Sequence, residues 1–172
     1  MRARCVWGLA LLGLAACSPS LNWRTVPVEQ LAALLPCKPD HAERQVDLGG
    51  TPRTLAMWGC EAGGALFAVS HLRVQAPATP EQVIAAWQLA ALRNLPSATA
   101  QALPFKTPAM AGSASAPGVM VRATGKRAEG QAVQAQLAWF SRGADVYHLA
   151  VFAPVLTPAM TDSFFNELHW QP

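Results

Sequence analysis

The chain has 172 residues, with 13 lysines and arginines against 10 aspartates and glutamates. A formal charge of +3, two units of which come from Arg2 and Arg4, is too small to predict a nucleic-acid-binding surface. Only 13% of the residues are charged, against roughly 25% in soluble domains. This low share indicates either an alanine-rich composition or a surface that a partner covers.

The amino terminus has the pattern of a secretory signal peptide. Two early arginines precede an apolar run from Cys5 to Leu14, and two alanines then come before Cys17. A positive start, a short apolar run and small residues before a cleavage site are the three parts of such a signal. The apolar run is much shorter than the roughly 20 residues that span a bilayer.

Residues 14–17, Leu-Ala-Ala-Cys, resemble the lipobox of bacterial lipoproteins. The resemblance implies cleavage before Cys17, a diacylglyceryl thioether on its sulfur, and acylation of the new amino terminus, for instance with palmitate. In that family a residue other than aspartate after the cysteine directs the protein to the outer membrane, and here that residue is Ser18. The alternative is an ordinary secretory signal followed by a fortuitous cysteine.

The lipobox divides the chain into three parts. Residues 1–16 are the expected signal peptide, residues 17–22 a short lipidated tether, and residues 23–172 a single domain. Removal of residues 1–16 leaves 156 of the 172 residues, which is enough to bury one hydrophobic core. We therefore expect a lipid-anchored protein of the outer membrane whose domain lies in the periplasm.

The lipobox also decides which cysteines are free to pair. Cys5 leaves with the signal peptide and Cys17 would carry the lipid, so Cys37 and Cys60 remain. Thiols are usually paired in exported proteins, and we expect these two to form a disulfide. The bridge would close a loop of about 24 residues, which corresponds to roughly 3 kcal/mol of stabilisation. The alternative is a reactive or metal-binding pair, although neither cysteine belongs to a Cys-x-x-Cys motif or has a histidine at ligand spacing.

Most of the first half of the domain is predicted to be strand. Residues 27–35 suit one or two helical turns or a buried strand, and residues 36–40 are expected to be irregular because they contain two prolines. Residues 53–61 and 65–74 predict two strands joined by a short glycine-containing turn, which makes a hairpin.

The clearest helix begins at Thr79. Thr79 is placed as the N-cap and Pro80 as the first helical residue, and Gln82, three residues after the cap, completes a capping box. An apolar stripe at helical spacing follows, and Pro96 ends the helix. Trp87 lies in this stripe and is interpreted as a core residue rather than a platform for a ligand.

Residues 96–118 form a long connection rich in proline, alanine and serine. Only residues 103–106 suggest a strand, which would lie at an edge of the sheet. Loops of this length in a compact domain are uncommon and are often functional. The segment is therefore either a candidate binding surface or a variable connection of low complexity.

Three further strands and a helix complete the domain. Residues 119–124, 132–140 and 145–152 predict an antiparallel meander. Thr157 is expected to cap a final helix that packs on the sheet and ends at Trp170. The fold class is therefore α+β, with an antiparallel β-sheet of about five to six strands flanked by helices.

This order of elements resembles the Mog1/PsbP-like fold. The resemblance rests on the hairpin, helix, meander and helix in sequence, on the Leu35-Pro36 pair near the start, and on the Phe164-Phe165 pair of the last helix. The strings at residues 34–40 and 59–64 also look like those of uncharacterised proteobacterial lipoproteins. The fold resemblance implies an accessory or assembly factor that binds other proteins, which is only an analogy at the level of the fold.

No motif predicts an enzyme, a metal site or a cofactor. The histidines His41, His71, His148 and His169 are scattered, and the chain has no Gly-x-Ser-x-Gly string and no phosphate-binding glycine loop. His148, in an apolar strand, is interpreted as a satisfied core or rim histidine. A catalytic alternative would use Cys37 as a thiolate with His41 as its base.

We therefore expect a non-enzymatic, membrane-anchored lipoprotein that binds or stabilises an envelope protein. One alternative is a carrier of a small apolar ligand, which requires a cavity between sheet and helices. The other is a thiol enzyme, which requires a free Cys37.

Overall fold

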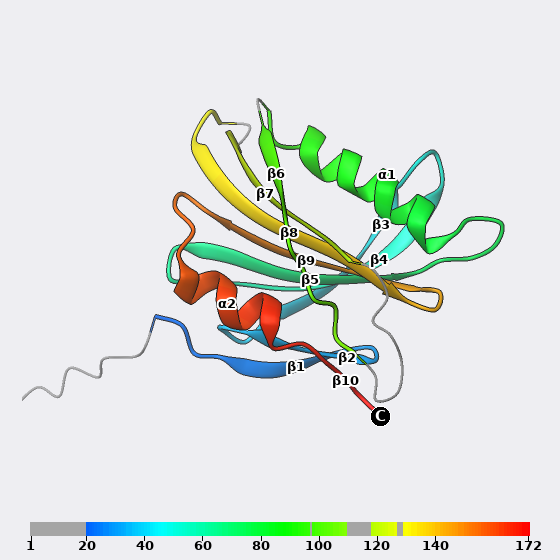
Figure 1. Cartoon of the computed structure of the whole chain (residues 1–172), viewed down its shortest axis with the longest axis horizontal. Coiled ribbons are helices and arrows are strands. Elements are labelled where there is room, and N and C mark those ends of the chain that lie inside the picture. Colours follow the sequence, from blue (N-terminus) through cyan, green and yellow to red (C-terminus); the bar gives the residue numbers. More distant parts are fainter. Residues whose placement is uncertain (1–19, 97, 110–117, 127–128) are drawn as a thin grey trace, which may run out of the picture.

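The computed structural model describes residues 20–96, 98–109, 118–126 and 129–172. The expected signal peptide, the lipidation site Cys17 and part of the 96–118 connection lie outside the described residues. The described part forms three layers, with a large antiparallel sheet in the middle (Figure 1).

The central layer is a seven-stranded antiparallel sheet in the order β3-β4-β5-β9-β8-β7-β6. Strands of this sheet that are neighbours in sequence pair with each other, except β5 and β6: β5 pairs with β9, and β6 lies at the edge beside β7. The strand bounds are β3 Asp40–Asp47, β4 Pro52–Ala62, β5 Ala65–Arg73, β6 Thr99–Leu103, β7 Val119–Lys126, β8 Ala132–Arg142 and β9 Asp145–Ala153.

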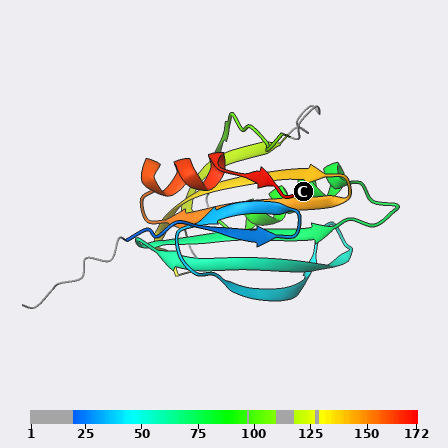
Figure 2. The ribbon, with the colours of Figure 1, turned by 90° about the horizontal axis from the view of Figure 1, so that it is seen from below.

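The two faces of this sheet are covered differently. Helix α1, Pro80–Arg93, lies on one face. The other face carries helix α2, Pro158–Asn166, and a three-stranded sheet in the order β1-β2-β10. The small sheet is formed by β1 Arg24–Val28, β2 Leu31–Leu35 and β10 His169–Trp170. Figure 2 shows α2 and the small sheet together against the large one.

Alternation along the central strands produces two separate cores. In β9, Tyr147, Leu149 and Val151 pack toward the small sheet and α2. Val146 and Ala150 face the opposite way and pack under α1. Successive side chains of a strand point to opposite faces, so a central strand that is buried on both sides contributes to both cores.

Much of the predicted secondary structure is confirmed. The hairpin at 53–61 and 65–74 corresponds to β4 and β5, and the three strands of the meander correspond to β7, β8 and β9. The helix from Thr79 is present with its capping box, because the Gln82 N–H donates to Thr79 Oγ1 at 3.4 Å and the Thr79 N–H donates to Gln82 Oε1 at 3.0 Å. The fold is α+β as expected, although the sheet is larger than predicted.

For residues 27–35 the sequence left helical turns or a buried strand open, and the structure has strands: the residues contribute to β1 and β2, and β2 is buried and paired on both sides. Three other details of the prediction are wrong. Strand β3 was not predicted, because its side chains are almost all exposed and polar and show no alternation. The edge strand lies at Thr99–Leu103 rather than 103–106. The last helix ends at Asn166, after which residues 169–170 pair with β2.

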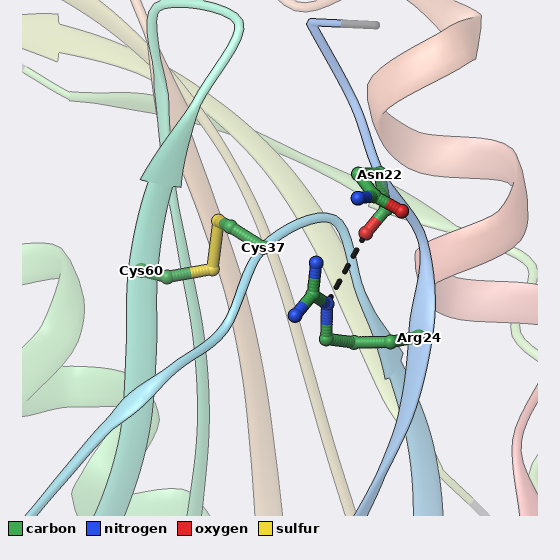
Figure 3. Close-up of a disulfide and its surroundings, with 4 residues drawn as sticks. All are labelled: Asn22, Arg24, Cys37 and Cys60. Atoms are coloured by element: carbon green, nitrogen blue, oxygen red, sulfur yellow. Dashed lines mark hydrogen bonds between the residues drawn. A yellow bond between two sulfur atoms is a disulfide. The ribbon is translucent and has the colours of Figure 1, made fainter. Parts of the chain in front are cut away.

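The disulfide between Cys37 and Cys60 is present (Figure 3). It joins the irregular segment after β2 to the C-terminal part of β4 and thereby links the small sheet to the large one. Close by, the Arg24 Nε donates to the backbone oxygen of Asn22 at 3.4 Å, at the start of β1. No helix in the described ranges is long and apolar enough to cross a membrane.

Candidate functional site

The residues that the sequence singled out do not form one site. Cys37 is bonded to Cys60 and therefore provides no free thiol for His41. The exposed His41 instead stacks on Trp58, with ring centroids 4.5 Å apart. Within the described ranges, no group of three or more His, Cys, Asp or Glu side chains could hold a metal ion.

Two hollows that the sequence did not reveal lie beneath helix α1. The first, which we call the apolar groove, has a volume of about 590 Å³ and lies under the C-terminal half of the helix. Its walls come from α1 and from strands β3, β4, β5, β8 and β9. The apolar lining residues are Val46, Leu48, Leu55, Leu66, Trp87, Ala90, Ala91, Leu95, Val133 and Phe152, and the polar ones are Asp47, Asn94, Glu129 and His148.

His148 is the buried polar residue of this groove. The strand register places it opposite Trp139, and its ring lies between two indoles, with centroids 4.7 Å from Trp139 and 4.9 Å from Trp87. Burial lowers its pKa from the ordinary 6.5 to about 3, so the imidazole is neutral at physiological pH.

The expectation that His148 is satisfied is wrong. Its Nε2 is buried and has no hydrogen-bond partner among the described residues, and the same holds for Nε1 of the neighbouring Trp139. The register places His148 between Trp139 of β8 and Ser70 of β5, and Trp87 of α1 packs against the same ring. Buried polar groups in proteins are rarely left unpaired. A ligand with a polar atom that reached His148 Nε2 or Trp139 Nε1 could supply the missing hydrogen bond.

The second hollow, the polar groove, has a volume of about 810 Å³ and lies under the N-terminal half of α1. Its charged side chains are Arg53 and Arg73, and no acidic residue lines it. Arg73 binds Asp145, with an Nη1–Oδ2 distance of 3.2 Å. The other lining residues are Gln45, Leu48, Gly49, Thr51, Pro52, Thr54, Gln75, Ala76, Pro77, Ala78, Gln82, Val83 and Ala86.

Arg53 differs from Arg73 because no acid balances it in the described structure. The residue is half-buried, and its Nε is fully buried without a hydrogen-bond partner. An unpaired buried donor on a charged group costs free energy until an acceptor reaches it. Sequence reasoning missed this residue, although a cation that precedes Leu55 and Met57 at alternate positions of one strand was a visible signal.

The β3–β4 turn separates the two grooves. Leu48 lines both of them, and the next residue, Gly49, lies against the helix, since a Cβ at its position would be 3.5 Å from Ala86 Cβ. The turn is held by the Gly50 N–H, which donates to Asp47 Oδ1 at 2.7 Å. Gly49 and Gly50 have φ values of 69° and 81°, a region that glycine adopts without strain.

A histidine and an aspartate lie together where β5 ends and β9 begins, and both are largely buried. His71 Nε2 lies 3.0 Å from Asp145 Oδ1, and the His71 ring packs beside Tyr147. The carboxylate of Asp145 also binds Arg73, so it contacts both the His71 imidazole and the Arg73 guanidinium. His71 and Tyr147 belong to the face opposite α1, so this cluster supports the small-sheet side of the fold.

Comparisons with known proteins identify no family. No family model matches this chain, and no curated protein is significantly similar to it. A solved structure of a protein of unknown function from Pseudomonas aeruginosa is similar over 81% of this chain and 86% of that one, at 16% identity and a TM-score of 0.41. A TM-score this low does not support an inference about function, so the grooves are interpreted from their own residues.

Proposed function

We propose that the protein is a non-enzymatic binding protein of the bacterial envelope that holds a small apolar ligand in the apolar groove beneath α1. The observation that carries the proposal is the groove itself. Its volume of about 590 Å³ lies within the roughly 300–1,000 Å³ of known ligand pockets, which are also mostly apolar with a few polar groups. Ten of its fourteen lining residues are apolar, which matches that description.

The rigidity of α1 supports this proposal. The capping box fixes the first turn, and Val83, Ile84 and Trp87 anchor the helix in the core beneath it. Small residues, Ala90 and Ala91, follow on the side that lines the groove. The hollow therefore results from two alanines on a firmly held helix, where larger side chains would fill the space.

The lipid anchor at Cys17 is part of the proposal. Leu21, four residues after Cys17, lies against the β4–β5 turn, because a Cβ at Gly63 would be 3.2 Å from Leu21 Cδ2. Leu66, just beyond that turn, lines the apolar groove. A lipid on Cys17 would therefore hold the groove within a short distance of the outer membrane, on the periplasmic side. Metabolic labelling with palmitate tests the anchor, and Cys17→Ser should abolish the label.

Binding is tested with the environment-sensitive apolar dye N-phenyl-1-naphthylamine and the mature chain carrying Cys17→Ser. We expect the dye to become fluorescent, to accept energy from Trp87, and to bind at least about tenfold more weakly to Ala91→Trp, which fills the groove. Ala85→Trp is the matched control, because Ala85 is exposed on the same helix. Absence of dye binding, or equal loss in both variants, would contradict the proposal.

A protein partner is the second candidate, and the edge strand β6 favours it. Strand β6 ends the large sheet, carries no charged residue, and is exposed from Thr99 to Ala102. The opposite edge, β3, carries five ionisable side chains, a usual protection against pairing with other chains. Cross-linking in intact cells followed by purification from solubilised membranes tests this candidate, and Gln101→Lys should reduce recovery of a partner that pairs with β6.

A further inference from the structure

We infer that the two grooves beneath α1 form one site for an anionic single-chain amphiphile, with its acidic group at Arg53 and its chain in the apolar groove. The inference rests on the proposed function and names the class of ligand. A fatty acid and a lysophospholipid share this chemistry, since both join one acyl chain to an anionic group.

Arg53 provides the site for the acidic group. Its half-buried guanidinium has no acidic partner in the described structure, and its buried Nε lacks an acceptor. Guanidinium groups bind carboxylates and phosphates with parallel hydrogen bonds that are stronger than those between neutral groups. An anionic ligand would therefore supply both the missing charge and the missing acceptor.

The surroundings of Arg53 favour a single anion. The polar groove has no acidic lining residue, and its other cation, Arg73, is already paired with Asp145. Among the neutral polar residues, Thr54 Oγ1 accepts a hydrogen bond from Gln45 Nε2 at 2.7 Å, at the base of the same hairpin. Arg53 is thus the cation of this groove whose charge is not balanced by any group in the described part of the chain.

The two grooves meet at Leu48, which stands between Arg53 and the apolar groove. Arg53 and Leu55 project from the same face of β4, and alternate residues of a strand are only about 7 Å apart. Leu55 lines the apolar groove, while Leu48 lines both grooves. An acyl chain that leaves Arg53 therefore has to displace the Leu48 side chain, the wall that the two grooves share, in order to reach Trp87 and Phe152.

Charge fixes the direction in which the ligand lies. The carboxylates that line the apolar groove belong to Asp47 and Glu129, and the cations of the two grooves both line the polar one. Asp47 is also occupied by the Gly50 N–H. An anionic group would be repelled at the acidic end and attracted at Arg53, so the charge distribution favours the orientation with the acidic group at Arg53.

The test compares ligands that share a chain and differ in charge. Dodecanoate, dodecyl lysophosphatidate and neutral 1-dodecanol displace the dye from the mature chain carrying Cys17→Ser. We expect both anions to bind about tenfold or more tightly than the alcohol, as one charge-assisted contact allows. The stronger of the two anions identifies the source as a free fatty acid or a lysophospholipid.

Variants of two arginines on the same hairpin complete the test. Arg53→Gln should remove the preference for the anions and leave binding of 1-dodecanol unchanged, while Arg53→Lys should retain part of the preference. Arg44→Gln is the control, because Arg44 is exposed on β3 and lines neither groove. Equal binding of the alcohol and the anions by the wild-type protein would overturn this inference but not the proposed function. Failure of all three ligands and the dye would overturn both.

Discussion

His148 is a neutral histidine in an apolar environment, and its protonation opposes folding. Its ring lies between Trp87 and Trp139, and burial lowers its pKa to about 3. In the unfolded chain the same group has its ordinary pKa of 6.5. Between these two values the unfolded chain binds a proton that the folded protein does not, so the free energy of unfolding decreases as the pH falls.

The first prediction concerns this pH dependence. Stability should be constant above about pH 7 and decrease by about 2 kcal/mol between pH 7 and pH 5 on account of His148. In His148→Leu, the difference between urea unfolding free energies at the two pH values should be smaller by that amount. His169→Gln is the control because His169 is exposed, and it should retain the wild-type difference. An unchanged difference in His148→Leu would show that burial does not hold the imidazole neutral.

The role of a single residue can be predicted from the sequence where that role does not depend on which residues lie next to it in the fold. The pairing of Cys37 with Cys60 follows from counting the cysteines of an exported chain, and the disulfide is present. The roles of Arg53 and His148 depend instead on what lies opposite them across the sheet and under the helix. The sequence predicts a satisfied His148 because a histidine in an apolar strand is more often a core or rim residue than a ligand, whereas in the fold its Nε2 is buried beside Trp139 without a hydrogen-bond partner among the described residues.

At the level of elements, the disulfide joins two layers of the fold. Cys37 follows β2 of the small sheet, and Cys60 lies in β4 of the large one. The two cysteines are separated by 23 positions. A covalent link over such a loop reduces the conformational freedom of the unfolded chain and stabilises the folded one by roughly 3 kcal/mol.

The second prediction follows from this link. The double variant Cys37→Ala, Cys60→Ala should have a free energy of unfolding about 3 kcal/mol lower than the wild type, measured by urea denaturation. Reduction of the wild-type protein with dithiothreitol should produce a similar loss, which separates the effect of the bond from that of the substitutions. Identical denaturation midpoints for all three samples would contradict a structural role for the bridge.

The two helices begin alike in sequence but differ in their caps. Thr79 and Thr157 both precede a proline at a helix start. The Thr79 side chain accepts a hydrogen bond from the Gln82 N–H, whereas Thr157 makes no side-chain capping bond. Position 82 is a glutamine that completes the capping box, and position 160 is a methionine that cannot do so.

The third prediction uses this matched pair. Thr79→Ala should lower the free energy of unfolding by about 1 kcal/mol, because it leaves helix N–H groups without an acceptor. Thr157→Ala should change it by no more than a few tenths of a kcal/mol, since no capping bond is lost. Urea denaturation of both variants under one set of conditions measures the difference. Equal losses in the two variants would mean that the capping hydrogen bond of Thr79 does not contribute to the free energy of unfolding.

Elements with a strong local pattern were predictable, and elements defined by their neighbours were not. Helix α1 could be predicted from its capping box and from the helical spacing of its apolar residues. Strand β8 could be predicted from the alternation of apolar residues with glutamines. Strand β2 was ambiguous because leucines at these spacings suit a helix as well. Strand β3 exists because β4 offers it an edge to pair with, and its polar residues carry no periodic signal.

On the scale of the whole molecule, the central sheet couples the two cores. Leu149 packs in the core of the small sheet, and its neighbour Ala150 packs in the core under α1. The same alternation holds in β8, where Ala138 and Trp139 belong to different cores. Neither core can lose its central strands without exposing the other, so the domain should unfold as one unit.

The fourth prediction is therefore that both cores unfold in a single transition. Trp87 reports on the core under α1, and Trp170 reports on the opposite one through its contacts with Phe140 and Tyr147. In protein labelled with 5-fluorotryptophan, the native ¹⁹F resonances of both residues should disappear at the same urea concentration, as a two-state transition requires. Trp87→Phe and Trp170→Phe assign the two signals. Earlier loss of the Trp170 signal would show that the small sheet detaches first, in which case the shared strands do not couple the layers.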